Sequence, residues 1–224
     1  MTPREQEPRN NHPEGLTPFQ ERLADGLIKV EAIQFGEVRT RHHKDNPDAP
    51  LTPYYIDLRM LRRDPNIKAQ AVYQYTQLML HTTFDLIADI PTAATPIASS
   101  LADKFHIGHI TPRVGEKEWG NKAKVDGMLA SDVGKTAIVI DDLISKGLSK
   151  LEAIATLEEK GIKVRDVLVL IDRQQGGVKQ VEEKGYKVHY AFTVTQLMDY
   201  YLRTGQITQE KYQIVRDYIA SENA

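Results

Sequence analysis

Two adjacent carboxylates, Asp141 and Asp142, follow a run of apolar residues in the stretch AIVIDDLISKGLSK, residues 137–150. A short turn of small and hydroxyl residues comes next, and it opens into a segment with helical spacing. Such a turn presents backbone N–H groups and the positive end of the helix dipole, which together bind phosphate. Carboxylates beside it suit a ligand that also carries the hydroxyl groups of a ribose and a bound Mg²⁺. The alternative is that one or both aspartates cap the next helix.

The segments around this stretch predict an α/β fold with a mostly parallel sheet covered by helices on both faces. Nearly continuous apolar strands that alternate with helices are typical of this class. The expected strands are 84–90, 106–112, 135–142, 164–172 and 187–193, and the expected helices between them are 96–105, 148–161 and part of 173–185. Before them we expect a helix over 16–33, strands over 33–38 and 53–59, and a helix over 67–81; the tail from residue 194 is predicted to be helical twice.

Four segments should meet at one edge of this sheet, because ligands of open α/β sheets bind at the carboxyl ends of the strands. They are the acidic pair with its turn, residues 91–96, residues 111–117 and residues 172–177. The sequence therefore predicts a ligand site at that edge.

Composition limits the function classes. The 224 residues suit one α/β domain, here 16–224, preceded by a polar, Pro-rich arm over 1–15 that we expect to be disordered. A net charge of −2 argues against a nucleic-acid partner, and no apolar run approaches the roughly 18 residues of a membrane span. The absence of cysteine excludes thiolate chemistry and fits a cytoplasmic location.

The stretch IVIDDLISKGLS resembles the phosphoribosyl-pyrophosphate (PRPP) motif of type I phosphoribosyltransferases. Other segments make the chain similar to orotate phosphoribosyltransferases, especially the branch found in UMP synthase: FGEV, PYYIDLR, IPTAATPIA, RVGEKEWGNK and LVLIDRQQGG. The resemblance implies the type I fold, with a small hood made of N-terminal and C-terminal segments. It also implies a glycosyltransferase that converts orotate and PRPP to orotidine 5′-monophosphate and pyrophosphate in pyrimidine biosynthesis. Mg²⁺ dependence and a homodimer are further expectations from the family.

The resemblance assigns the PRPP-binding residues. Asp141 and Asp142 would hold the ribose hydroxyls and stabilise the positive charge of the transition state, while Mg²⁺ is held mainly through PRPP and not by protein side chains. The residues that would surround the 5′-phosphate are Ser145, Lys146, Gly147, Leu148 and Ser149.

The remaining roles concern pyrophosphate and orotate. Arg113 and the catalytic Lys117 belong to a loop that would close over the pyrophosphate; a solvated basic loop is the alternative. Arg173 would face the orotate carboxylate, because a guanidinium binds planar acceptors at two points; a surface ion pair is the alternative. Tyr55, together with Tyr54, would approach the orotate ring, and core packing explains these aromatic residues equally well.

The chain also departs from the family pattern. Val114 stands where the family usually has a lysine, Thr92 to Ala94 lack a lysine that many bacterial members have, and Lys146 and Leu148 stand in the phosphate loop where small or hydroxyl residues are usual. Trp119 and Lys44 lie in segments whose roles stay open. Val114 and Leu148 favour a second hypothesis, in which the chain is a catalytically weakened regulatory protein that binds PRPP or a nucleotide on the same fold.

Overall fold

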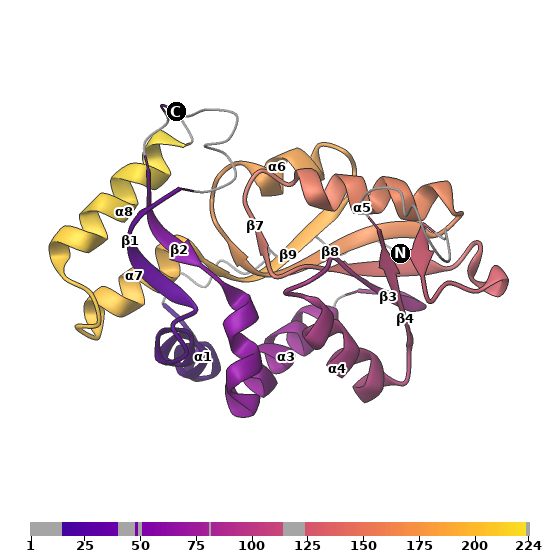
Figure 1. Ribbon diagram of the computed structural model, residues 1–224, viewed down its shortest axis with the longest axis horizontal. Coiled ribbons are helices and arrows are strands. Elements are labelled where there is room, and N and C mark those ends of the chain that lie inside the picture. Colours follow the sequence, from indigo (N-terminus) through magenta and orange to yellow (C-terminus); the bar gives the residue numbers. More distant parts are fainter. Residues whose placement is uncertain (1–14, 40–47, 49–50, 81, 114–123, 223–224) are drawn as a thin grey trace, which may run out of the picture.

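The computed structural model describes residues 15–39, 48, 51–80, 82–113 and 124–222 (Figure 1). Most of the expected N-terminal arm lies outside these ranges, as do Lys44, Val114, Lys117 and Trp119. The predictions made for them therefore stay predictions. None of the helices in the described ranges is long and apolar enough to cross a bilayer.

A central sheet organises the molecule. Its parallel strands follow the order β4-β3-β6-β8-β9, and the short β5 adds an antiparallel edge beside β4. A further short strand, β7, pairs with the carboxyl end of β8. The strand bounds are Leu86–Asp89 (β3), Gly108–Pro112 (β4), Val125–Asp126 (β5), Thr136–Ile140 (β6), Leu143–Ile144 (β7), Lys163–Asp172 (β8) and Lys187–Thr193 (β9). The predicted parallel α/β architecture is confirmed, whereas β5 was not foreseen.

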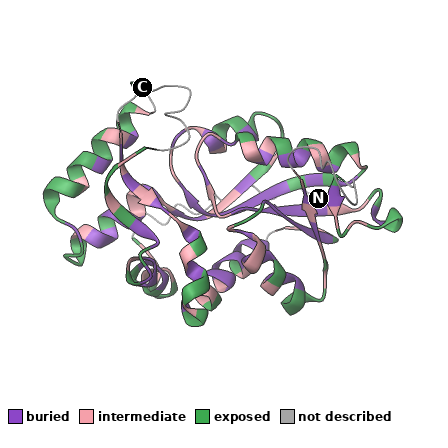
Figure 2. Ribbon diagram, in the orientation of Figure 1, coloured by how far each residue is buried: buried purple, intermediate pink, exposed green. Residues whose placement is uncertain are grey.

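Helices cover both faces of this sheet, as Figure 1 shows. Helices α3 (Pro65–Met79) and α4 (Thr95–Phe105) lie on one face, and α5 (Leu148–Glu159) and α6 (Gly177–Glu182) lie on the other. Along β6, Ile138 and Ile140 join the core with α3 and α4, whereas Ala137 and Val139 join the core with α5. Alternate side chains of a strand point to opposite faces, so a sheet buried on both sides needs an unbroken apolar strand. Figure 2 shows that the strands are buried along most of their length.

The N-terminal and C-terminal segments form one hood at the side of the sheet. It contains the antiparallel pair β1 (Ile33–Val38) and β2 (Thr52–Ile56), with α1 (Pro18–Lys29), α7 (Val194–Arg203) and α8 (Gln209–Ser221). The Tyr201 hydroxyl donates to the Ala24 carbonyl at 2.9 Å, and Tyr200 donates to Asp25 at the same distance. One buried and one partly buried contact thus join the N-terminal helix α1 to helix α7 of the C-terminal segment.

One element differs from the sequence prediction in a way that matters for the site. The strand predicted over 53–59 ends at Ile56, and Leu58–Arg63 forms a 3₁₀-helix, η1. The Asp57 carboxylate accepts the Arg59 N–H at 3.1 Å and so caps this turn. As a result, the arginines at and after position 59 belong to a helical turn in front of α3.

Candidate active site

The acidic pair lies in a break between two strands. β6 ends at Ile140 and β7 starts at Leu143, and both pair with the single long strand β8. Across the break, the Asp141 N–H donates to the Leu168 carbonyl at 3.0 Å and the Leu170 N–H donates to the Asp142 carbonyl at 2.9 Å. The Tyr75 hydroxyl of α3 donates to the Asp141 carbonyl at 2.6 Å. The backbone of both aspartates is therefore held from the sheet and from a helix.

The two carboxylates have different surroundings. Asp141 is 5% exposed; one of its oxygens lies 2.6 Å from Lys150 Nζ, and the other accepts the Asp142 N–H at 2.8 Å. Asp142 is only partly buried, and its Oδ1 accepts the Leu143 N–H at 2.8 Å. Asp141 is thus turned toward a buried lysine, which leaves Asp142 as the more accessible acid.

The pKa of Asp142 is raised to about 7, first by burial and then by the neighbouring Asp141 carboxylate, while Lys150 opposes the shift. Both effects disfavour a second negative charge beside that of Asp141. Asp142 therefore titrates near neutral pH.

Sequence reasoning missed Lys150, although a signal was present. The buried residues of α5 are Lys150, Ala153, Ile154 and Leu157, which repeat at the spacing of one helix face. A lysine at the first position of an apolar stripe indicates a buried cation that needs a partner. The stretch upstream offers that partner in the acidic pair.

The predicted phosphate loop, residues 145–149, leads into the N-terminus of α5. Gly147 is the N-cap of α5 with φ of 80°, and as a glycine it brings no side chain to cap the helix. Glycine suits this position because the left-handed backbone carries no steric cost for it. The Leu148 side chain, which replaces a hydroxyl residue of the family pattern, is 64% exposed. It is therefore largely exposed to solvent.

The segment after β8 packs directly against this loop. A Cβ atom added at Gly177 would lie 2.3 Å from the Ser145 carbonyl oxygen and 2.8 Å from a side-chain carbon of Ile144. Backbone atoms cannot approach a side chain so closely, so only glycine allows the contact. This explains one glycine of the DRQQGG motif by its role in placing the phosphate loop.

The cation of the phosphate loop is engaged by the end of the chain's last helix. Lys146 Nζ lies 3.1 Å from the Glu222 carboxylate, just beyond α8. Gln175 donates to the same carboxylate at 3.1 Å and to the Tyr218 hydroxyl at 3.4 Å. The sequence predicted the helical tail, but no local pattern indicated that its end reaches the loop.

Arg173 occupies the predicted place and has an unusual environment. Its N–H donates to the Ile144 carbonyl at 2.9 Å, which ties it to the strand that leads into the phosphate loop. Its guanidinium carbon lies 5.0 Å from the ring centre of Tyr54. Its Nε is buried and has no hydrogen-bond partner among the described residues. A buried donor without a partner points to an acceptor supplied by a ligand.

The two tyrosines of β2 point to opposite sides of the strand. Tyr54 is fully buried under Arg173, whereas the Tyr55 hydroxyl accepts a hydrogen bond from Arg59 at 3.3 Å. The aromatic ring beside Arg173 is therefore that of Tyr54. The role predicted for Tyr55 toward orotate stays a prediction.

A buried carboxylate fixes the opposite end of the edge. Asp89 accepts hydrogen bonds from Thr95, from Thr111 and from His109 Nε2, the last at 3.0 Å. Burial alone would raise the pKa of Asp89, but these hydrogen bonds outweigh it and hold the pKa below its usual value. The cluster joins β3, β4 and α4 at the rim.

Arg113 follows β4 and forms a two-point ion pair with Asp126 of β5. The pair holds Arg113 at the base of the loop predicted to cover pyrophosphate. Lys117, the catalytic residue predicted in that loop, lies outside the described residues.

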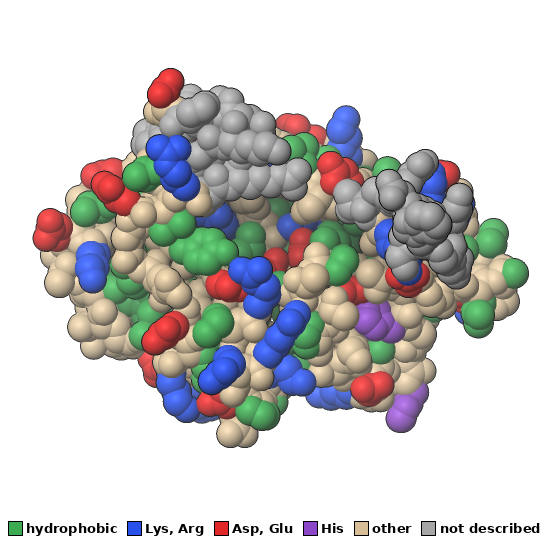
Figure 3. Space-filling model, in the orientation of Figure 1, with side chains coloured by type: hydrophobic (Ala, Val, Ile, Leu, Met, Phe, Trp, Pro, Cys, Tyr) green, Lys and Arg blue, Asp and Glu red, His purple; other side chains and the backbone are tan. Residues whose placement is uncertain are grey.

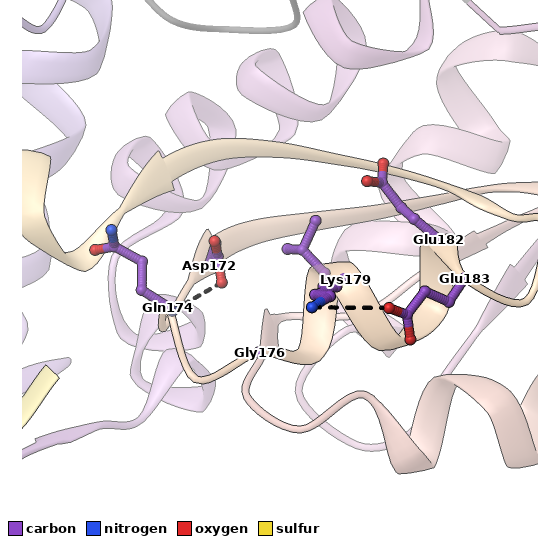
Figure 4. A pocket seen from close by; sticks show the side chains of 7 residues that line it. Asp172, Gln174, Gly176, Lys179, Glu182 and Glu183 are labelled. Atoms are coloured by element: carbon purple, nitrogen blue, oxygen red, sulfur yellow. Dashed lines mark hydrogen bonds and ion pairs between the residues drawn. The ribbon is translucent and has the colours of Figure 1, made fainter. Parts of the chain in front are cut away.

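Two hollows flank the edge, and they differ in charge. The larger, about 780 Å³, is shown in Figure 4; its lining is Asp172, Gln174, Gly176, Val178, Lys179, Glu182 and Glu183. Three acidic side chains make it unsuitable for a phosphate. The second, about 580 Å³, is lined by Arg62, Pro65, Lys68, Thr92, Thr95 and Pro96. Figure 3 shows basic side chains gathered on this face over η1 and α3, and Arg62 donates to the Thr92 carbonyl at 2.5 Å.

Comparison with known proteins identifies the family of the chain. No family model matches the chain. The orotate phosphoribosyltransferase of Chlamydia felis is 30% identical to it over 190 residues, which cover 82% of this chain and 88% of that protein. The chain belongs to the orotate phosphoribosyltransferase family. The resemblance predicted from its motifs is confirmed.

Some of the proteins that this orotate phosphoribosyltransferase family member matches are much longer than it is. The bifunctional enzyme PyrF/PyrE of Nostoc is 28% identical over 203 residues, which cover 89% of the chain but 41% of that protein. The solved UMP synthase of Leishmania donovani has a TM-score of 0.79 and 30% identity, covering 90% of the chain and 42% of that structure. The chain thus spans about two fifths of the length of both. The similar structure also confirms the expected type I fold for this family member.

The contact between Gly177 and Ser145 predicts a different outcome for two neighbouring glycines. Gly177→Ala should displace residues 145–149 and lower the free energy of unfolding by about 2 kcal/mol or more, because the added Cβ overlaps backbone atoms. Gly176→Ala meets no atom within 4 Å and has φ of 83°, so it should cost only about 1–2 kcal/mol of backbone strain and leave the loop in place. Chemical denaturation and backbone amide NMR shifts of residues 145–149 measure the two effects. Equal shifts in both variants would contradict the packing role.

The raised pKa of Asp142 predicts a stability that depends on pH. The folded protein holds a proton on this acid up to about pH 7, whereas the unfolded chain releases it near pH 3.8, so stability falls as pH rises between these values. Asp142→Asn should therefore be more stable than the original chain at pH 8, by about 1–2 kcal/mol, with the gain disappearing near pH 4. Urea denaturation at both pH values measures this. The exposed Asp103→Asn serves as a control, and an equal effect of Asp142→Asn at pH 4 and pH 8 would refute the assignment.

Proposed function

We propose that the chain is an orotate phosphoribosyltransferase, which transfers the phosphoribosyl group of PRPP to orotate and releases pyrophosphate. The observation that carries the proposal is the buried, unpartnered Nε of Arg173 on the same edge as the acidic pair and the uncapped N-terminus of α5. A guanidinium suits the orotate carboxylate, a carboxylate suits ribose hydroxyls, and a helix N-terminus suits a phosphate. The three groups match the three parts of the substrates.

The reaction needs positioning and charge stabilisation, not a protein nucleophile. The bond between ribose C1 and the pyrophosphate oxygen breaks, the bond from C1 to orotate N1 forms, and the N1 proton passes to water or to the departing pyrophosphate. Positive charge develops on the ribose, which the Asp142 carboxylate would stabilise. Arg173 would orient orotate, and the leaving pyrophosphate would be met by Lys117, Arg113 and the basic hollow at Arg62.

Mg²⁺ would enter with PRPP as part of the substrate complex. In the described ranges, no group of three or more His, Asp or Glu side chains is placed to hold a metal ion. The ion would be held mainly through the oxygens of PRPP and by water, and not by protein side chains. A cytoplasmic homodimer, in which the loop after Arg113 reaches the neighbouring site, completes the proposal.

A regulatory protein that binds PRPP or a nucleotide without turnover is the second candidate. The observation in its favour is that Lys146 is paired with Glu222 and that Leu148 brings no hydroxyl to the loop. The exposed position of Leu148 and the free helix N-terminus support the enzyme instead, because backbone N–H groups supply most of a phosphate cradle.

Orotate depletion in the presence of PRPP and Mg²⁺ tests the enzyme directly. Arg173→Gln should raise the KM for orotate and lower kcat/KM by about 10–150-fold, since hydrogen bonds to a charged group contribute about 1.5–3 kcal/mol. Lys117→Ala should abolish turnover. The exposed Arg165→Gln on the same strand, β8, is the matched control and should behave like the original chain. Absence of turnover together with thermal stabilisation by PRPP or orotidine monophosphate would reject the enzyme in favour of the regulatory protein.

The pair between Lys146 and Glu222 predicts a variant with tighter binding. If Lys146 contacts the 5′-phosphate, Glu222 competes with the ligand, and Glu222→Gln should tighten PRPP binding up to about fivefold at low salt. The gain is limited because a partly exposed ion pair contributes about 1 kcal/mol at most. Isothermal titration calorimetry measures it, with Glu183→Gln, which removes an exposed pair with Lys179, as the control. Weaker binding by Glu222→Gln would show that Glu222 supports the loop and does not compete.

A further inference from the structure

Lys150 is a buried cation that the reaction described above does not use. The residue is 4% exposed and lies in the first turn of α5. Its ammonium contacts Asp141 Oδ2 at 2.6 Å, the Leu143 carbonyl at 2.5 Å and the Ser149 hydroxyl at 3.4 Å. A positive charge is unfavourable at a helix N-terminus, and burial of an ammonium costs several kcal/mol unless it is paired. Helix stability therefore does not explain this lysine.

Lys150 lies where it reduces the repulsion between negative groups in the site. Two adjacent carboxylates stand beside a cradle that must accept a phosphate, and all three negative groups repel one another. The ammonium touches the acid that is turned inward, the carbonyl between the acidic pair and the loop, and a hydroxyl of the loop. It is thus placed to offset the charge of Asp141 and to hold the loop against the strand end.

We propose that Lys150 is a positioning residue that fixes the charge and the inward orientation of Asp141, so that Asp142 alone faces the ribose hydroxyls of PRPP and the phosphate loop carries less negative charge. The inference rests on the proposed function. It assigns different roles to the two acids, whereas the family motif treats them as a pair.

The other charged groups around Asp142 do not replace Lys150. Four titratable groups interact electrostatically with Asp142: its neighbour Asp141, Lys150 of α5, Tyr75 of α3 and Arg59 of η1. Tyr75 is neutral near neutral pH because burial raises the pKa of its hydroxyl. The Arg59 guanidinium is exposed and binds Asp57 at 2.7 Å and 2.8 Å. Within the described ranges, Lys150 is therefore the cation that touches the acidic pair.

The test combines variants of Lys150 with two measurements. The carboxyl ¹³C signal of Asp142 is titrated in the ligand-free protein, and the affinity for Mg²⁺–PRPP is measured by calorimetry from pH 6 to pH 9. Lys150→Met should raise the titration midpoint of Asp142 by about one pH unit or more and weaken PRPP binding at pH 7 at least about tenfold. Lys150→Arg, which keeps the charge, should leave the Asp142 midpoint close to its original value and the PRPP affinity within a few-fold of it.

A double variant separates charge balance from packing. Lys150→Met with Asp141→Asn removes both charges, which leaves no unpaired buried ion, so this variant should fold. It should return the Asp142 midpoint to the original value or below and restore PRPP affinity to within a few-fold. A lower melting temperature of Lys150→Met with an unchanged midpoint, or a double variant without recovery, would overturn the proposal and leave Lys150 a structural role only.

Failure of the proposed function has a different signature. If the original chain neither binds nor converts PRPP, the function fails, and the titration in the ligand-free protein still decides whether Lys150 sets the charge of the acidic pair. If the chain binds PRPP but the Lys150→Met midpoint does not move, the function stands and the inference fails.

Discussion

The length of β8 is the constraint on which the site depends. Strand β8 runs for 10 residues and pairs first with β6 and then with β7, so the chain beside it can leave the ladder for two residues and rejoin it. Those two residues are Asp141 and Asp142. Because β8 continues past them, their backbone keeps hydrogen bonds to Leu168 and Leu170. Their side chains, however, need not alternate between the two faces of the sheet as those of a strand do. A polar site can therefore stand inside an otherwise apolar sheet.

The parts of the fold that local pattern controls were predictable. Strands 33–38 and 187–193 match the structure residue for residue. The helix predicted over 148–161 corresponds to α5, and Gly161, the last residue of that range, follows the C-cap with φ of 78°. Apolar periodicity and glycine placement suffice for these features because they depend on residues a few positions apart. The carboxyl edge was also predictable, because the carboxyl ends of parallel strands lie at the same edge of a sheet.

Contacts between residues far apart in sequence account for what was missed. The two-residue strand β5 carries too few residues for a periodic signal, and its pairing with β4 depends on the sheet. The placement of Tyr54 under Arg173 joins two segments more than a hundred positions apart. The contact of Glu222 with Lys146 arises only once the hood has formed. Lys150 is intermediate, because the sequence shows both its position in the buried stripe and the acidic pair upstream, but not that the two are in contact.

The end of α8 touches two parts of the site at once. Glu222 holds Lys146 of the phosphate loop, and Tyr218, one helical turn earlier, contacts Thr52 at 3.2 Å and packs edge-on against Tyr54, the ring under Arg173. The same short helix end is therefore a structural support shared by two segments that are far apart in sequence, the loop that carries Lys146 and the strand that carries Tyr54.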